Sequence, residues 1–164
     1  VGRELSSINT LELERFVRRR GYVRSARVYA SIDGVLTIEI AQRKPVMRFN
    51  TDDGYNFYVT DDGYVLPQQR QFSSYVPIVT GRFELPFLRD YVGPLDSLAG
   101  SSEKKVGKNY LFLAKLINFV KFVGYDDFWN AFIVQIRVNG ADPQTEDEPQ
   151  VEIVPRAGDQ VIAL

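Results

Sequence analysis

Two pairs of adjacent aspartates are the residues of this chain whose types and spacing could support chemistry. They stand in the runs Asp52-Asp53-Gly54 and Asp61-Asp62-Gly63. Two converging carboxylates can serve as general acid and general base in glycan hydrolysis, and carboxylates also bind Ca²⁺. Each Asp-Gly pair nevertheless lies between two strand-like runs, as in a hairpin turn, and neither run continues with the spacing of a calcium-binding loop. We therefore interpret both runs as turns and expect no metal site.

The other catalytic chemistries lack their usual residues. The 164 residues include no His and no Cys, which removes the commonest general base, the commonest transition-metal ligand and every thiolate nucleophile. A Gly-rich phosphate loop is also missing, since Gly100-Ser101-Ser102 precedes Lys104-Lys105 at the wrong spacing. The sequence thus predicts a protein without catalytic activity, cofactor or small-molecule substrate. The enzyme hypothesis left open is a carboxylate-based glycan hydrolase of the cell wall, which needs two Asp or Glu converging in a cleft.

Charge and aromatic content give no reason to expect a nucleic acid partner. The formal net charge is -1, so the chain has no overall positive field for phosphates. Residues 1–48 hold ten Lys/Arg against five Asp/Glu, whereas residues 126–164 hold two against eight, which fits either two solvated surfaces or two partner-facing patches. Aromatic rings could stack on bases or sugars, but in strand-like runs they usually pack in a core. We assign that core role to Tyr55, Phe57 and Tyr58.

The beginning of the chain predicts an α-β-β unit. Asn9 is a suitable N-cap for a helix, with Glu12 three residues later. Pro45 then removes a donor from the strand ladder and marks a break in the chain. We therefore expect a first domain over residues 1–45 and a second over residues 46–164. The predicted elements of the first domain are a helix from about Thr10 to Arg20 and strands over residues 23–30 and 35–40.

The rest of the chain predicts a mainly antiparallel β-sheet domain with one long helix. The run Phe132 to Val138 alternates most regularly, and its even-numbered side chains are expected in the core. Trp129, at the corner between helix and strand, is expected to be a buried anchor. The fold class is therefore α+β. The other predicted elements are strands over residues 55–59, 64–66, 77–81, 151–154 and 160–164 and a helix around residues 108–123.

Several of these runs, taken in order, resemble the extracytoplasmic region of the FtsQ/DivIB cell-division family. Residues 21–29 and the strand that ends in Gln42-Arg43-Lys44-Pro45 are similar to the second half of the family's POTRA domain. Gln42 stands where the family typically has Glu. Three later runs resemble the family's hairpin, its Leu-Pro step and its late strand-turn-strand element: Tyr58 to Leu66, Val76 to Gly81 and Val151 to Leu164.

The resemblance implies a non-catalytic scaffold of the bacterial divisome. Such a protein binds FtsB- and FtsL-like partners and has a single anchoring helix in the inner membrane, with this region in the periplasm. The first strand and helix of a complete β-α-α-β-β POTRA domain are expected upstream of Val1, and further closing strands are expected beyond Leu164. The alternative is a POTRA-containing outer-membrane assembly or secretion protein, which would require repeated POTRA units or a membrane barrel.

Partner binding is expected at two places. We expect β-augmentation, in which an extended segment of a partner pairs with an exposed sheet edge through main-chain hydrogen bonds. The candidate edge is the predicted last strand, formed by Gln160, Val161, Ile162, Ala163 and Leu164. The second candidate is a basic face formed by Arg18, Arg19, Arg24 and Arg27.

Overall fold

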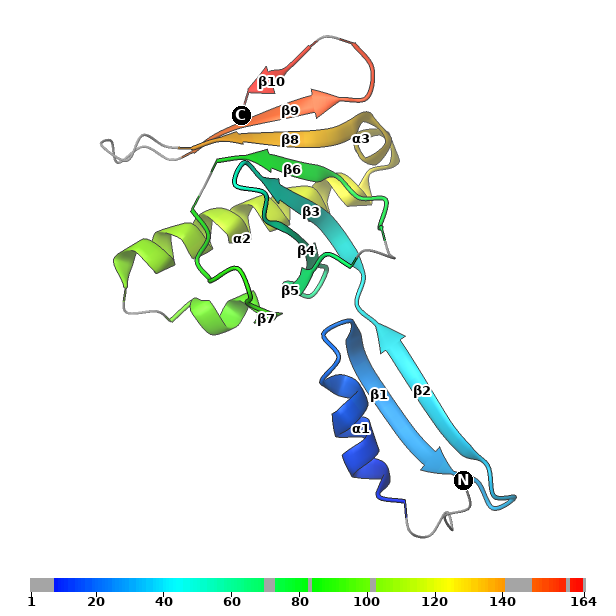
Figure 1. Ribbon diagram of the computed structural model, residues 1–164. Helices are drawn as coiled ribbons and strands as arrows, with labels where there is room; N and C mark the ends of the chain where they lie inside the picture. The colour runs from blue at the N-terminus through cyan, green and yellow to red at the C-terminus, as the bar shows by residue number, and fades with distance from the viewer. Residues whose placement is uncertain are drawn as a thin grey trace. The chain divides into compact units, whose positions relative to one another are not determined.

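The computed structural model describes residues 8–69, 73–82, 84–100, 103–140, 149–158 and 160–163. The chain divides into two compact units, Val1–Arg43 and Lys44–Leu164. Among the described residues, helices account for 29% and strands for 37%, so the predicted α+β class is confirmed (Figure 1).

The first unit is a helix packed on a two-stranded antiparallel sheet (Figure 1). Asn9 caps the helix, since its Oδ1 accepts the N–H of Glu12 at 3.1 Å. The helix also occupies the outer edge of the first strand, where the N–H of Val28 donates to Glu14 Oε1 at 2.9 Å. The elements of this unit are α1 (Thr10–Arg18), β1 (Val23–Ala30) and β2 (Leu36–Gln42).

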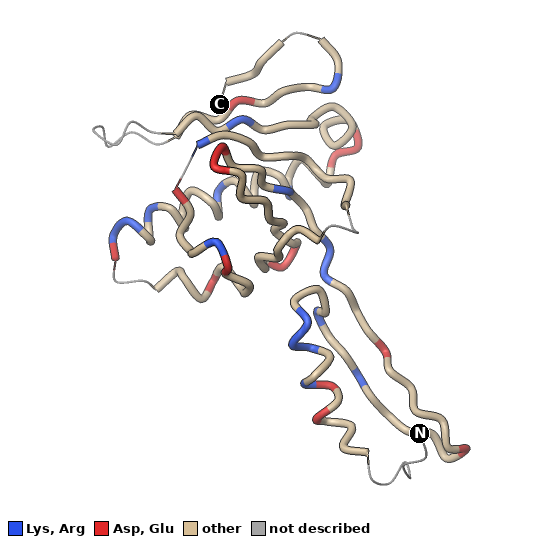
Figure 2. The backbone as a smooth tube through the Cα atoms, in the orientation of Figure 1, with Lys and Arg blue, Asp and Glu red and all other residues tan. Residues whose placement is uncertain are grey.

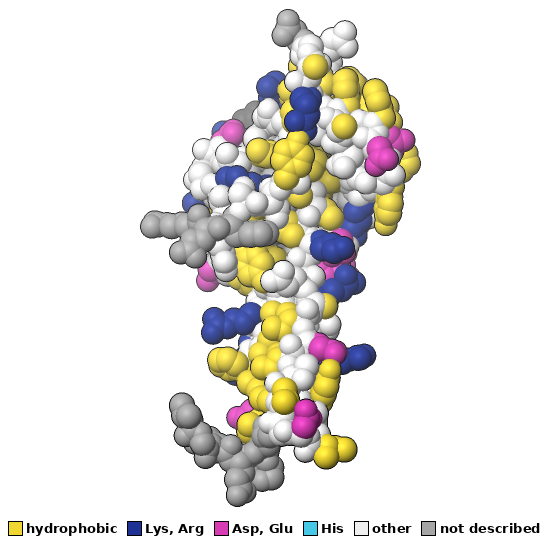
Figure 3. All heavy atoms as spheres, turned by 90° about the vertical axis from the view of Figure 1, so that its right-hand side faces the viewer, with side chains coloured by type: hydrophobic (Ala, Val, Ile, Leu, Met, Phe, Trp, Pro, Cys, Tyr) yellow, Lys and Arg dark blue, Asp and Glu magenta, His cyan; other side chains and the backbone are white. Residues whose placement is uncertain are grey.

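The first unit has a small core and an apolar face that is only partly covered. Ala26 and Val28 of β1 are buried, and they pair with Ile40 and Ile38 of β2, so all four side chains share one face. Ile38 and Ile40 remain 43% and 51% exposed. Figure 3 shows hydrophobic side chains at the surface of this unit between scattered charges. A helix on a two-stranded ribbon is close to the smallest arrangement that is stable in water.

The second unit is a mixed sheet whose described strands follow the order β10-β9-β8-β6-β3-β4-β5-β7. The pairs β3–β6 and β6–β8 are parallel, and the remaining neighbours are antiparallel. The β6–β8 pair is parallel because α2 returns the chain across the sheet between them. The elements are β3 (Pro45–Thr51), β4 (Asn56–Thr60), β5 (Tyr64–Pro67), β6 (Ile78–Gly81), β7 (Gly93–Pro94), η2 (Leu95–Leu98), α2 (Lys104–Tyr125), α3 (Asp127–Phe132), β8 (Ile133–Asn139), β9 (Gln150–Pro155) and β10 (Ile162–Ala163).

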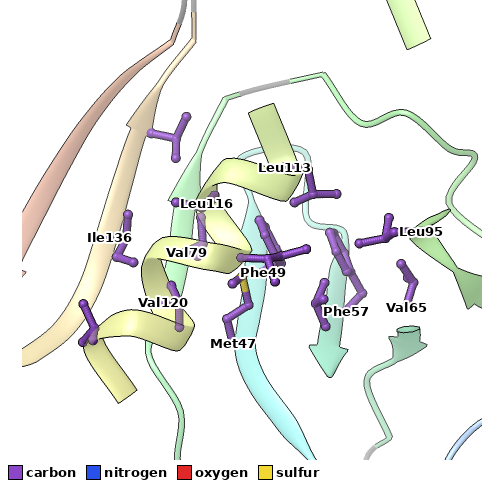
Figure 4. Close-up of a cluster of buried hydrophobic side chains, with 14 of the residues drawn as sticks. Met47, Phe49, Phe57, Val65, Val79, Leu95, Leu113, Leu116, Val120 and Ile136 are labelled. Carbon is purple, nitrogen blue, oxygen red and sulfur yellow. The ribbon is translucent and has the colours of Figure 1, made fainter. Parts of the chain in front are cut away.

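The core of the second unit lies between α2 and one face of this sheet. Leu113, Leu116 and Val120 recur at helical spacing and project from α2 toward the strands (Figure 4). They meet Phe49 of β3, which stacks on Phe57 of β4 with ring centroids 4.5 Å apart. The predicted core role of Phe57 and Tyr58 is confirmed, since both are fully buried, and Tyr55 is half-buried.

The predicted register of β8 is right only for its second half. Ile136 and Val138 are buried, as expected from the alternation. Phe132 instead ends α3, and a register shift just after Ile133 buries that side chain and leaves Val134 half-buried. A bulge of this kind changes which residues face the core, and a strict period of two cannot anticipate it.

The prediction that Trp129 is a buried anchor is wrong. Its side chain is 37% exposed, and that of Phe128 is 64% exposed. The physical reason is the cap of α3, because Asp126 Oδ1 accepts the N–H groups of Phe128 at 3.0 Å and Trp129 at 3.1 Å. This cap starts a short helix at the corner, where the rings pack on one another: Phe128 stacks on Phe132 at 5.5 Å.

Candidate functional site

The two aspartate runs form the same hairpin turn twice, at the ends of β3 and β4. Each run is Thr-Asp-Asp-Gly-Tyr, beginning at Thr51 and at Thr60. In the second turn, Thr60 Oγ1 donates to Asp62 Oδ1 and accepts the N–H of Tyr64 at 3.0 Å. The first turn repeats these bonds, and the Gly of each turn has a positive φ. The interpretation of both runs as turns is therefore confirmed.

One carboxylate in each turn accepts a hydroxyl hydrogen bond within the turn. Asp53 accepts the hydroxyl of Thr51 and pairs with Arg89. The Thr51 hydrogen bond, more than the Arg89 charge, holds the pKa of Asp53 below its ordinary value, although desolvation acts in the opposite direction. Within the described ranges, no three Asp or Glu side chains are grouped so that they could hold a metal ion.

Replacing Thr51 with Val should raise the pKa of Asp53 toward its ordinary value. The substitution removes the hydroxyl that stabilises the ionised carboxylate, and it leaves Arg89 in place. A depressed carboxyl pKa contributes stability above the unfolded-state pKa, and this contribution is lost as pH falls through the folded-state pKa. Carboxyl chemical shifts followed through a pH titration measure the change. Thr60→Val is the matched control, because it alters the other turn, and an unchanged Asp53 titration in Thr51→Val would contradict the assignment.

Two hollows on the described surface are large enough to admit a small molecule. The first, of about 480 Å³, is lined by one short segment and includes Asp90. The second, of about 320 Å³, lies at the ends of β6 and β8 and includes Asp52 with Arg82 and Arg137. Each of these two hollows contains one carboxylate, so neither supplies the converging pair that glycan hydrolysis requires.

The candidate edge strand is β10, which lies at one end of the large sheet. Ile162 and Ala163 pair with Ile153 and Glu152 of β9, and no described strand pairs with their other side. Val161 and Ile162 are 50% and 37% exposed. Gln160 is exposed next to them, and Leu164 lies outside the described residues. The strand therefore offers an edge of backbone N–H and C=O groups to another chain.

The opposite edge of the sheet is closed to such pairing. There β7 consists of Gly93 and Pro94, and the latter has no N–H to donate. The 3-10 helix η2 follows directly, and Leu95 at its start is buried with the core. A short edge strand with Pro is a recognised way to prevent pairing with other chains. Of the two ends of the described sheet, the β10 end is thus the one suited to an added strand.

The four arginines of the predicted basic face are exposed but divided between two elements. Arg18 and Arg19 lie at the end of α1, where Arg18 pairs with Glu14 at 3.6 Å. Arg24 and Arg27 lie on β1, and Arg27 points away from the face that carries the buried Ala26 and Val28. The structure therefore does not bring all four together on one face.

The helical spacing of the core residues predicts only the inner face of α2. Leu111, Phe122 and Tyr125 on the other side are apolar as well, and this outer face was not predicted. These side chains are 60%, 70% and 90% exposed. Their positions could have been predicted from the sequence. Leu111, Lys115, Asn118, Phe122 and Tyr125 follow one another at intervals of four and three residues, which places them on one face of a helix.

Comparisons with known proteins give one family match. Residues 44–164 match the family described as "FtsQ/DivIB, C-terminal related". A search of curated proteins finds no significant match. No helix in the described part of the chain is both long enough and apolar enough to span a bilayer. The FtsQ/DivIB proteins are non-enzymatic, membrane-anchored proteins of cell division. Since the match covers most of the chain, the protein belongs to the FtsQ/DivIB, C-terminal related family of cell-division proteins.

Proposed function

We propose that this chain is a scaffold of the divisome that binds extended segments of FtsB- and FtsL-like division proteins along the outer edge of β10. The observation that supports this most is the contrast between the two ends of the sheet. The β10 end is an unpaired edge with exposed apolar side chains, whereas the β7 end is blocked by Pro94. The alternative of an outer-membrane assembly or secretion protein is not favoured, because the family match covers the second unit.

The mechanism is the addition of a partner strand to the sheet. Main-chain hydrogen bonds supply the affinity, and alternate side chains of the added strand supply the specificity. Val161 and Ile162 are successive residues whose side chains point to opposite faces, so each face of the edge presents one exposed apolar side chain to an added strand. The β9 strand beneath β10 is itself held by β8, where Arg137 pairs with Glu152 at 3.2 Å. The strand that supports β10 is thus fixed on its other side by β8.

The same proposal places this region in the periplasm, on a protein with one helix in the inner membrane. It treats residues 1–45 as part of a POTRA-like domain and residues 46–164 as the β domain of the family. The incompletely covered apolar face of β2 supports the first assignment. Ile38 and Ile40 are about half exposed there, and no described strand pairs with the outer side of β2. A further strand and helix would cover such a face.

Breaking the outer edge of β10 should weaken partner binding by at least roughly tenfold. Ile162→Pro removes a backbone donor and prevents regular strand geometry in β10, at the end of the sheet where Ile162 pairs with Ile153 of β9. Isothermal titration with a peptide from an FtsB-like partner measures the loss. Ile162→Val is the matched control, because it retains a β-branched side chain and the backbone N–H, and it should bind as the parent does.

An Ile162→Pro variant that binds the peptide as tightly as the parent would overturn the proposal. The partner site would then have to lie elsewhere, and the exposed arginines Arg18, Arg19, Arg24 and Arg27 would be the next surface to alter.

A further inference from the structure

The long helix α2 carries charge of one sign only. Between Lys104 and Tyr125 it contains five lysines and no Asp or Glu. Figure 2 shows this as a tube that is blue and tan along the whole of α2. Three of the lysines fall in its first two turns, where the positive end of the helix dipole disfavours cations. The helix dipole therefore does not explain these lysines, although Lys105 pairs with Glu84 at 2.9 Å. The three lysines are Lys104, Lys105 and Lys108.

The outer face of α2 carries large apolar side chains, whereas a solvated helix face usually carries polar ones. Leu111, Phe122 and Tyr125 are largely exposed, and the exposed Lys115 and Asn118 complete a stripe with spacing four, three, four and three. This spacing averages 3.5 residues, which is the period of a seam between two packed helices. The opposite face of α2 already contributes the core of the unit, so the stripe is additional to what folding requires.

We propose that the outer face of α2 is a second docking surface, which binds an acidic amphipathic helix of a partner protein. The apolar stripe would form the seam, and carboxylates on the partner would lie against the lysines of α2. This surface is distinct from the β10 edge, both in its residues and in its mode of recognition. Binding at α2 would extend the scaffold role to a helical partner. It does not depend on strand addition at β10.

The centre of the stripe favours a protein helix over a lipid surface. Lys115 and Asn118 lie midway between the apolar residues at the two ends. An ammonium and an amide in the middle of a membrane-inserted face must give up their hydration. At a seam between two helices, a polar Asn or Lys specifies the register of the partner at some cost in stability. The charge of α2 in turn selects an acidic partner rather than a basic one.

A designed peptide tests the proposal on the whole chain. The probe is a synthetic helix of about 20 residues, with Leu at alternating three- and four-residue intervals and Glu at the flanking positions. The same peptide with Lys in place of Glu is its control. Trp129 is the single Trp, is 37% exposed and follows the end of α2, so its fluorescence reports binding. Backbone amide shifts then show whether the contact follows residues 104–125.

Two variants separate docking from folding. Lys104→Glu combined with Lys108→Glu places carboxylates near the helix N-terminus, where they suit the dipole, and should weaken binding at least roughly tenfold. Phe122→Ala truncates a side chain that is 70% exposed and should weaken binding without loss of fold. Lys44→Glu and Leu88→Ala are the matched controls, since both residues are exposed and lie outside α2, and both variants should bind as the parent does.

The expected result is that the Glu peptide binds, the Lys peptide does not, and both α2 variants lose affinity. Equal binding of the two peptides, or full binding by Lys104→Glu/Lys108→Glu, would overturn the proposal. So would binding of phosphatidylglycerol vesicles in place of the Glu peptide, which would assign the face to a lipid surface. Self-association of the chain through residues 104–125, with no binding of the Glu peptide, would assign it to a second copy. Binding at α2 should be unaffected by Ile162→Pro, so its failure is distinguishable from failure at β10.

Discussion

Replacing Ile136 with Asp is expected to unfold the second unit. Ile136 is 1% exposed, sits in β8 between β6 and β9, and faces the side chains of α2 (Figure 4). A carboxylate at this position would have to ionise without a partner or remain protonated among hydrocarbon, and either state costs several kcal/mol. Because a domain of this size is stable by only about 5–15 kcal/mol, that cost is comparable to its whole stability. Circular dichroism and guanidinium titration measure the loss.

The control for this substitution is Ile78→Asp. Ile78 lies on the neighbouring strand β6, pairs with Gln135 and is 36% exposed, so the new carboxylate can reach water. The expected cost is about 1 kcal/mol, which reflects the poor strand propensity of Asp. If both variants lost the same stability, the position of Ile136 in the core would be contradicted.

Gly81→Ala is the second substitution with a large expected effect, about 3 kcal/mol or more. Gly81 ends β6 with φ of 118°, and a Cβ added there would lie 1.9 Å from the backbone oxygen of Val138. That oxygen belongs to β8, the parallel neighbour of β6, and a backbone atom cannot move aside as a flexible side chain can. The two strands would have to separate, so the midpoint of chemical unfolding should fall sharply.

Gly124→Ala is the matched control for Gly81→Ala. Gly124 lies within α2, and an added Cβ would find no atom within 4 Å. Because Ala is a better helix former than Gly, this variant should be more stable than the parent by about 0.5–1 kcal/mol. A Gly81→Ala protein as stable as the parent would contradict the close approach of β6 and β8.

Local patterns predicted most of the elements because each depends on neighbouring residues. The Asp-Gly turns require only a four-residue run, and the core face of α2 follows from the helical period of Leu113, Leu116 and Val120. Parallel pairing of β6 with β3 and β8 was not predicted, since strand order depends on contacts far apart in the chain. The bulge near Ile133 was missed for a related reason, because it is set by the pairing of β8 with β9.

The candidate site was less accessible to sequence reasoning than the fold. The last strand was predicted, and its position at the end of the sheet agrees with an edge, but only the structure shows that the other end is blocked by Pro94. Four arginines that read as one basic face are divided between α1 and β1, because proximity in sequence does not fix which way a side chain points. The exposure of Phe122 and Tyr125 likewise could not be predicted, because it depends on which other elements pack against α2.

Amide hydrogen exchange of the whole chain, with and without a saturating peptide from an FtsB-like partner, tests the central claim most directly. Strand addition at the edge of the sheet predicts new protection of the backbone N–H groups in residues 160–163, because those that now face water would donate to the partner. The β7 edge at Gly93 should show no change, since Pro94 prevents pairing there. Protection that appears on β2 or at Arg24 and Arg27 instead, with residues 160–163 exchanging as in the free chain, would contradict the account.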